Sequence, residues 1–229
     1  RGAGSVRIGL VDIDTSHPDN WVPIERDLGH EVVAVWDGGS LHPEDYARKF
    51  AEKHSIPHVP NRFEDMVALV DCVVVHGCDW DLHVERARPF AEAGKSILFD
   101  KPTAGKARDL AQIAQWARDG VRITGGSSLR WCYEVQQWLA RPVEERGLPD
   151  TVLVGCGVDE FNYGCHAYGL LAGLMGGGSC CVRHLGKGVQ RRVLVNWPDG
   201  RAGVVVLGKA DGSMPFYATI VANRGVSSF

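Results

Sequence analysis

The segment Ser96-Ile97-Leu98-Phe99-Asp100-Lys101-Pro102 decides the fold class that this 229-residue sequence predicts. Its first four residues have the length and apolar content of a buried strand, and polar residues follow at once. The proline at position 102 steers Lys101 away from α-helical geometry and toward extended geometry. The segment therefore predicts a strand whose end holds Asp100 and Lys101 at the edge of a sheet, over a reactive cleft.

Similar short apolar runs occur along the first 125 residues and alternate with amphipathic segments. This alternation is typical of a parallel sheet covered by helices on both faces. The predicted strands are 6–11, 31–36, 72–75, 96–99 and 121–124, and the predicted helices include 42–54, 62–69, 82–93 and 106–117. We therefore expect an α/β domain of the nucleotide-binding type, a doubly wound parallel sheet, over residues 1–125.

The pattern changes after Gly126, where strand-like stretches become dominant. Pro198-Asp199-Gly200 is a hairpin turn between two apolar runs. The predicted strands are 151–157, 189–196, 201–207 and 216–221, and the predicted helices are 129–140 and 166–174. These elements predict an α+β domain with an open, mostly antiparallel sheet over residues 126–229. One face of that sheet is expected to pack on the helices and the other to form a homo-oligomer interface.

Composition narrows the class of protein. The net charge of −3 and the lack of a basic patch argue against nucleic acid as a partner. The longest apolar stretches are only strand-length, so no membrane span is expected, and the first residues lack the apolar stretch of a secretory signal. The seven cysteines form no CxxC pair and are odd in number, which favours a reduced, cytoplasmic setting.

A metal site in the C-terminal half is conceivable but is not predicted. The candidate ligands are Cys165, His166, Cys180, Cys181 and His184. Their spacing is not that of a standard zinc module. We therefore expect no metal, and interpret the cysteines as small buried apolar residues.

Asp37 is a candidate cofactor-binding residue, because ligands of such sheets bind outside the carboxyl ends of the strands. It ends the second predicted strand, 25 positions after Asp12. An acidic residue at this place commonly binds a ribose hydroxyl, and it would repel a 2′-phosphate, which favours NAD over NADP. The alternative is a solvated loop aspartate.

Lys101 and two histidines are candidates for proton chemistry. Lys101 can bond a substrate hydroxyl, relay its proton or form a Schiff base, and the alternative is a surface lysine in a tight turn. His166, in Asn162-Tyr163-Gly164-Cys165-His166, can accept a proton near neutral pH. His83 follows the strand that ends at Val75 and is expected on the same side of the sheet. A lone histidine of this kind is more often structural.

Several stretches together resemble the Gfo/Idh/MocA oxidoreductases. They are Val6-Arg7-Ile8-Gly9-Leu10-Val11, Val33-Ala34-Val35-Trp36-Asp37, Ala93-Gly94-Lys95-Ser96-Ile97-Leu98-Phe99-Asp100-Lys101-Pro102 and Asn162-Tyr163-Gly164-Cys165-His166. The third looks like the family's signature, which usually closes in Glu-Lys-Pro, and the fourth looks like its Asp-x-Gly-x-His segment. The resemblance covers nearly the whole chain.

The resemblance implies a Rossmann domain followed by an α/β domain with an open sheet. It also implies NAD(P)-linked oxidation or reduction of sugars, cyclitols or related small molecules. Residue by residue, Lys101 would bond and polarise the reacting hydroxyl or carbonyl, His166 would be the acid/base, and His83 would lie near the nicotinamide. The nicotinamide performs the hydride chemistry, while the protein positions it and moves the proton.

The phosphate loop departs from the family pattern. Where the family has G-x-G-x-x-G/A, this chain has Asp12-Ile13-Asp14-Thr15-Ser16-His17, with no glycine between Leu10 and Gly29. Each carboxylate beside a pyrophosphate would cost on the order of 1 kcal/mol. The hydroxyls of Thr15 and Ser16 and the following helix N-terminus can still bind phosphate. Asp12, Thr15 and Ser16 are therefore placed in the candidate cofactor site.

Two further departures concern the second domain. Asn162 stands at the family's Asp position, where it cannot act as a carboxylate base but can orient a substrate by hydrogen bonds. Members of the family usually run well beyond 229 residues, so the second domain is expected to be trimmed.

Three functional hypotheses remain open from the sequence. The first is an NAD(P)-dependent oxidoreductase of a polyhydroxylated small molecule, with Lys101 and His166 handling the proton. The second is a redox-silent lyase, isomerase or hydrolase without a cofactor, in which Asp12, Asp14, His17, Lys101 and His166 supply acid/base groups. The third is a non-catalytic sensor or binding module. The scaffold alone does not decide among them.

Overall fold

The computed structural model describes residues 4–209 and 215–229, in two compact units of residues 1–126 and 127–229. The first three residues, on which the expectation about a secretory signal partly rests, lie outside the described residues. Among the described residues, no helix is long and apolar enough to cross a membrane.

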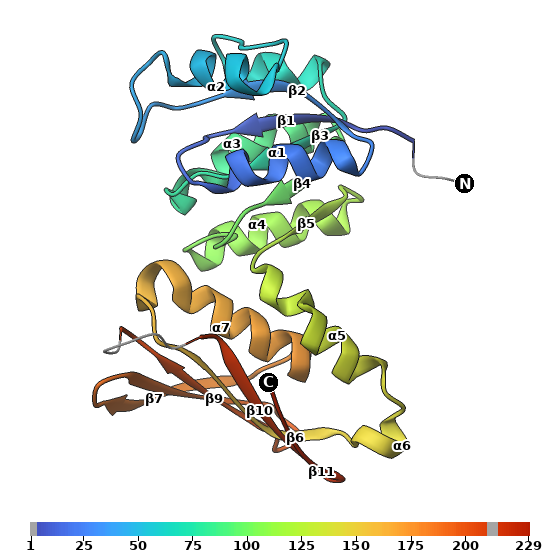
Figure 1. The fold of residues 1–229 in the computed structure, drawn as a ribbon, viewed down its shortest axis with the longest axis vertical. Coiled ribbons are helices and arrows are strands. Elements are labelled where there is room, and N and C mark those ends of the chain that lie inside the picture. The colour runs from blue at the N-terminus through green and yellow to red at the C-terminus, as the bar shows by residue number, and fades with distance from the viewer. Residues whose placement is uncertain (1–3, 210–214) are drawn as a thin grey trace. The chain divides into compact units, whose positions relative to one another are not determined.

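The N-terminal unit is built on a five-stranded parallel sheet (Figure 1). Its strands are β1 (Arg7–Val11), β2 (Glu31–Trp36), β3 (Cys72–Val75), β4 (Ser96–Phe99) and β5 (Ile123–Gly125), in the order β2-β1-β3-β4-β5. An isolated parallel bridge between Ala34 and His58 continues the pairing beyond β2. The predicted Rossmann-like parallel sheet is therefore confirmed.

Helices cover both faces of this sheet, because each helix has one apolar side to bury. They are α1 (His17–Asp27), α2 (Tyr46–His54), α3 (His83–Glu92) and α4 (Ala107–Arg118), with short 3₁₀ helices at Phe63–Ala68 and Trp80–Leu82. One core joins α1 and α2 to the sheet through Val22 and Phe50, and the other joins α3 and α4 through Phe90 and Trp116. A fully buried phenylalanine such as Phe90 contributes about 1.5–3 kcal/mol.

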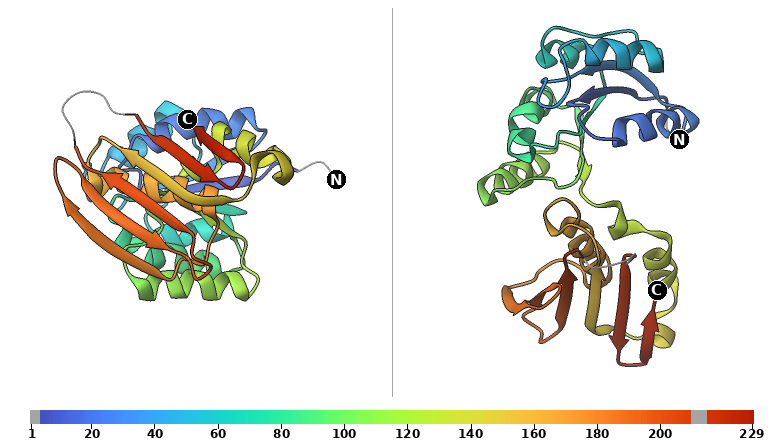
Figure 2. Two further views of the ribbon diagram at one scale, coloured as in Figure 1. Left: turned by 90° about the horizontal axis from the view of Figure 1, so that it is seen from below. Right: turned by 60° about the vertical axis from the view of Figure 1, so that its left-hand side comes forward.

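The C-terminal unit has a six-stranded sheet in the order β11-β10-β6-β9-β8-β7 (Figure 2). Its strands are β6 (Pro149–Cys156), β7 (Cys181–Lys187), β8 (Arg191–Asn196), β9 (Ala202–Leu207), β10 (Tyr217–Ala222) and β11 (Gly225–Ser228). Among the strands that the structure describes in this unit, only the β6–β9 pair is parallel, so the prediction of an open, mostly antiparallel sheet is confirmed.

A long helix, α7 (Glu160–Met175), packs along one face of this second sheet. Its apolar side chains, including Leu170, Leu171 and Leu174, share a core with the inward residues of the strands and with α5 (Tyr133–Ala140). The opposite face carries partly exposed apolar side chains such as Leu153 and Val221. The alternation along the strands matches one buried and one accessible face.

Several predicted boundaries in this unit are wrong. The helix predicted at 166–174 begins at Glu160, and the helix predicted at 129–140 is a 3₁₀ turn (Ser128–Trp131) followed by α5, with Cys132 extended between them. The strands β7 and β11 and the short α6 (Val143–Arg146) were not predicted. β7 is exposed along nearly its whole length, so it lacks the apolar alternation that identifies a strand.

Candidate active site at the strand ends of the N-terminal unit

Asp12 follows β1 and closes the loop that leads into α1. It is 5 % exposed and has a φ of 57°, a left-handed conformation that aspartate tolerates better than most residues. Its Oδ1 accepts the N–H of Gly38 at 2.9 Å, and its Oδ2 lies 3.0 Å from Nε of Arg86. Burial raises the pKa of Asp12, and Arg86 opposes that shift without cancelling it.

Arg86 extends from α3 and is held by aromatic rings as well as by Asp12. Its guanidinium lies 4.9 Å from the ring centre of Trp36 and 5.1 Å from that of Phe63. Asp12 was predicted to bind the cofactor. The structure places its carboxylate in a buried ion pair that connects the loop after β1 with α3, so its charge is compensated inside the protein.

Asp37 lies beside a polar pocket at the carboxyl end of β2. Its Oδ1 accepts the N–H of Ile13 at 3.1 Å and its Oδ2 accepts the N–H of Gly39 at 3.3 Å. The pocket has a volume of about 530 Å³ and is lined by Trp36, Asp37, Glu44, Ala47, Arg48, Val59, Pro60 and Asn61. A carboxylate has acceptor capacity beyond these two bonds, so Asp37 can also accept hydroxyl groups.

The remaining loop residues organise the N-terminus of α1. Oγ1 of Thr15 accepts the N–H of His17 at 3.1 Å, while Ser16, the N-cap residue, makes no side-chain cap bond. Asp14 accepts the N–H of Cys78 at 2.8 Å. The first N–H groups of a helix lack partners within the helix and attract anions. This loop therefore offers a helix N-terminus and two hydroxyls, as the sequence predicted, despite having no glycine.

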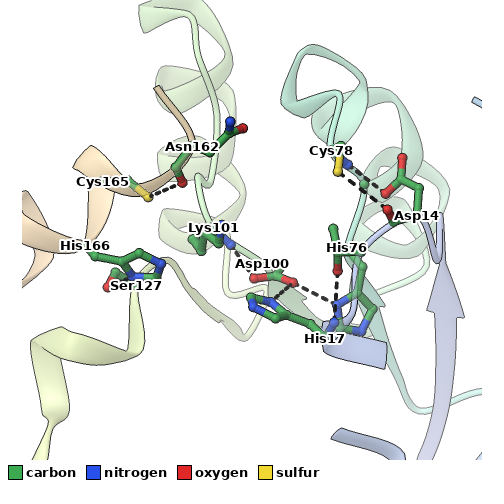
Figure 3. Close-up of polar contacts among 12 residues, drawn as sticks. Asp14, His17, His76, Cys78, Asp100, Lys101, Ser127, Asn162, Cys165 and His166 are labelled. Atoms are coloured by element: carbon green, nitrogen blue, oxygen red, sulfur yellow. Dashed lines mark hydrogen bonds and ion pairs between the residues drawn. The ribbon is translucent and has the colours of Figure 1, made fainter. Parts of the chain in front are cut away.

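Lys101 is the second residue after β4, at the strand end as predicted, and its side chain is partly exposed. Its backbone N–H donates to Oδ1 of Asp100 at 2.6 Å. Oδ2 of Asp100 lies 2.6 Å from Nδ1 of His17 and 2.9 Å from Nδ1 of His76 (Figure 3). Burial favours a higher pKa for Asp100, but the hydrogen bonds from His17 and His76 outweigh it and hold the pKa well below its usual value.

His76 is a site residue that the sequence reasoning missed. It follows β3 as Asp100 follows β4, and these adjacent parallel strands pair Val75 with Phe99. Two polar residues placed directly after two neighbouring buried strands meet at the same edge of the sheet. The position of His76, directly after an apolar run, was the sequence signal that could have identified it as a site residue.

His83 lies at the start of α3 and is fully buried. One ring nitrogen is 3.0 Å from the carbonyl oxygen of Thr103 and the other is 2.8 Å from that of Gly77. The side chain therefore connects the loops after β3 and β4. His83 therefore supports the two loops from inside the protein, and its side chain does not project into the solvent.

Asn162 and His166 lie in the first turns of α7, in the C-terminal unit (Figure 3). Nδ1 of His166 is 2.7 Å from Oγ of Ser127, and its ring meets the edge of Phe216. The amide of Asn162 donates to Asp159 at 2.5 Å. Both candidates therefore share one helix, and hydrogen bonds orient both side chains.

The cysteines are all free, and most are not buried. The interpretation as buried residues is wrong for Cys78, Cys180 and Cys181, which are exposed, while Cys156 is buried. Partial desolvation of its sulfur, with the nearby carboxylate of Asp14 adding to the effect, raises the pKa of Cys78 to about 11, so it remains a thiol at neutral pH. Within the described residues, no cluster of three or more His, Cys, Asp or Glu side chains is arranged to hold a metal ion.

Comparisons with known proteins follow the same division of the chain. A family model named GFO_IDH_MocA, described as an oxidoreductase family with an NAD-binding Rossmann fold, matches residues 6–124. The trans-1,2-dihydrobenzene-1,2-diol dehydrogenases of Danio rerio and Homo sapiens are 29% and 28% identical over 116 residues, which is 50% of this chain. The matched region spans only 33% of either relative.

Solved structures resemble the whole chain in fold. GenD2 from gentamicin A biosynthesis, in complex with NAD, matches with a TM-score of 0.81 and 17% identity, over 100% of this chain and 73% of that one. Scyllo-inositol dehydrogenase from Lactobacillus casei, with NAD(H) and scyllo-inositol bound, matches with a TM-score of 0.76 and 15% identity, over 98% and 76%. At sequence identities of 15% and 17%, the structural similarity establishes only that the fold is shared.

Proposed function

The chain belongs to the Gfo/Idh/MocA oxidoreductases, a family with an NAD-binding Rossmann fold, and from that premise we propose that it is an NAD-dependent dehydrogenase or reductase of a sugar-like or other polyhydroxylated small molecule. The observation that carries the proposal is the polar pocket beside Asp37, at the end of β2. That is where a Rossmann domain places the adenosine half of a dinucleotide.

The loop after β1 fits a dinucleotide better than its sequence implies. The ion pair with Arg86 compensates Asp12, and Asp14 is engaged by the N–H of Cys78. In this proposal the pyrophosphate lies against the N-terminus of α1, near Thr15 and Ser16. Asp37 accepts the ribose hydroxyls and opposes a 2′-phosphate, which favours NAD over NADP.

The proposed chemistry divides between the cofactor and the protein. A bound nicotinamide supplies hydride transfer. Lys101 bonds and polarises the reacting hydroxyl or carbonyl oxygen, His166 moves a proton, and Asn162 orients the substrate. The substrate class is supported by relatives and structural neighbours whose names are those of dihydrodiol and inositol dehydrogenases.

Cofactor binding is the direct test of this proposal. The purified protein is titrated with NADH and with NADPH while nicotinamide fluorescence and thermal stability are recorded. A cofactor at 100 times its Kd is expected to stabilise the protein by about 2.7 kcal/mol. NADH is expected to bind more tightly than NADPH. A protein that responds to neither cofactor contradicts the proposal.

A redox-silent lyase, isomerase or hydrolase is the second candidate. The observation that favours it is the hydrogen-bonded pair of His17 and Asp100, an acid/base arrangement that joins the end of the loop where the family has glycines to the residue after β4. Turnover of a small molecule without any nicotinamide, in a protein that fails the titration above, would establish this second function.

The accessible face of the C-terminal sheet supports a further expectation, a homo-oligomer. Leu153 is 36% exposed, and Val221 is 42% exposed. Analytical ultracentrifugation tests this expectation, and a Leu153→Glu variant that sediments as a smaller species would locate the interface on this face. A cytoplasmic location also remains a prediction.

A further inference from the structure

His17 and Asp100 form a hydrogen-bonded pair where β1, β3 and β4 end. His17 is the first residue of α1, and Asp100 is the first residue after β4. Nδ1 of His17 and Oδ2 of Asp100 are 2.6 Å apart. Because Nδ1 faces a carboxylate acceptor, it carries the ring proton, which leaves the lone pair of neutral His17 on Nε2.

Asp100 is an ionised acceptor with a fixed orientation. It is 2 % exposed and receives hydrogen bonds from His17, from His76 and from the backbone N–H of Lys101. These donors hold its pKa well below the usual value against the opposing effect of burial. A carboxylate held in this way stabilises positive charge on a neighbouring imidazole.

His76 is the second histidine that donates to Oδ2 of Asp100, and its burial carries an energetic cost. It is fully buried, and its Nε2 is a buried polar atom for which the described residues offer no hydrogen-bond partner. An unsatisfied buried polar atom costs about 1–3 kcal/mol and calls for an explanation. Burial lowers the pKa of His76, so it stays neutral and serves Asp100 as a donor. Of the two histidines on Asp100, only His17 is therefore partly exposed.

The outer nitrogen of His17 is accessible. The side chain is 29 % exposed, and within the described residues its Nε2 is neither buried nor hydrogen-bonded. Its ring stacks on Trp21 with centroids 5.2 Å apart and planes 11° apart, and the edge of Trp21 also meets His76. Stacking and the bond to Asp100 together fix the plane of the ring and direct Nε2 outward.

We propose that His17, oriented by Asp100, is a second proton-transfer residue of this enzyme. The proposal rests on the dehydrogenase function proposed above. When an alcohol is oxidised, its carbon loses a hydride with the electron pair to the cofactor and its hydroxyl loses a proton as the C=O bond forms. The proton binds the lone pair of Nε2, and the imidazolium keeps its Nδ1–H bond to Asp100. In reduction, Nε2–H returns the proton to the carbonyl oxygen.

The test compares His17→Gln with a matched control, His184→Gln, which changes an exposed histidine on β7. For each protein we would measure kcat and KM for a polyol substrate, and Kd for NADH by fluorescence. His17→Gln is expected to lose about 100-fold or more in kcat. Its KM and Kd are expected to stay within about threefold of wild type, and His184→Gln is expected to match wild type.

The His17→Ala variant distinguishes a role in proton transfer from a purely structural role. Imidazole added to this variant is expected to restore part of kcat, because it replaces the lost acid/base group. Circular dichroism first establishes that the variant is folded. Asp100→Asn, which has nearly the same shape, is expected to lower kcat without changing KM, and it serves as the second variant if His17→Ala does not fold.

The outcomes separate this inference from the proposed function. Wild-type turnover with an equally active His17→Gln variant overturns the role of His17 alone. Loss of NADH affinity with kcat retained overturns it as well and makes His17 a cofactor-binding residue. A folded His17→Ala variant that imidazole does not rescue also contradicts it. A wild-type protein that neither binds a nicotinamide nor oxidises a polyol removes both proposals together.

Discussion

Asp12 and Asp100 are buried carboxylates at the same edge of one sheet, yet their pKa values move in opposite directions. Asp12, after β1, is dominated by burial, which raises its pKa although Arg86 is paired with it. Asp100, after β4, is equally buried, but donors on two histidines hold its pKa low. Burial alone therefore does not decide the charge of a site, because the number and kind of donors decide it.

The difference also separates the two loops in function. The loop after β1 departs from the glycine-rich pattern of the family, and Arg86 neutralises its first carboxylate internally. The loop after β4 keeps the Lys-Pro segment, and its carboxylate orients His17, which is accessible. The carboxylate of Asp12 links two elements of the scaffold, and that of Asp100 orients a group proposed for chemistry.

Removing Arg86 is expected to cause the largest loss in the free energy of unfolding. Arg86→Met leaves Asp12 buried without its counter-ion, and breaking a buried pair costs about 3–5 kcal/mol. The measurement is the free energy of unfolding in urea at neutral pH. Arg7→Met is the matched control, because Arg7 pairs with Asp71 in a solvent-exposed bridge that is worth at most about 1 kcal/mol. Equal losses in both variants would show that the Asp12–Arg86 pair is not effectively buried.

Asp100→Asn is expected to have a smaller effect on stability, with a pH dependence that distinguishes the two carboxylates. It removes charge-assisted bonds worth about 2 kcal/mol in total at pH 7. The folded-state pKa of Asp100 is depressed, so its contribution is present above the unfolded pKa of about 3.9 and is lost as the pH falls toward the folded value. The gap between variant and wild type should therefore shrink below about pH 4.

Asp12→Asn is expected to show the opposite trend. The folded-state pKa of Asp12 is raised, so ionisation of Asp12 disfavours the folded state as the pH rises through the unfolded and then the folded pKa. The stability of wild type relative to Asp12→Asn should therefore rise as the pH falls through that range. Urea titrations of the three proteins at several pH values from 7 down to about 2.5 check both trends, and parallel curves would contradict the assignment.

Asp37→Asn is expected to have the smallest effect and to act on binding. It removes the charge that faces the proposed ribose, so NADH affinity should fall about tenfold, or about 1.4 kcal/mol. NADPH affinity should fall less or rise, because repulsion of the 2′-phosphate is removed. Asp119→Asn, an exposed carboxylate at the end of α4, is the control. Unchanged affinity for both cofactors would place the ribose away from Asp37.

The N-terminal unit was more predictable than the C-terminal unit for a physical reason. Its buried strands are continuous apolar runs, and glycines such as Gly94, with a φ of 68°, mark where helices end. In the C-terminal unit β7 is exposed and α7 starts six residues before the predicted helix, at Glu160 and not at His166. Periodicity reports burial, so elements that bury little are invisible to it.

The sequence by itself determined the parallel sheet, the position of Lys101 at a strand end and the acidic residue after β2, because these follow from local apolar runs and their boundaries. Only the tertiary structure decided which partners the carboxylates have. Asp12 meets Arg86 across 74 residues, and Asp100 meets His17 across 83. The strand order β2-β1-β3-β4-β5 brings these distant loops to one edge, and no local pattern specifies which strand ends become neighbours.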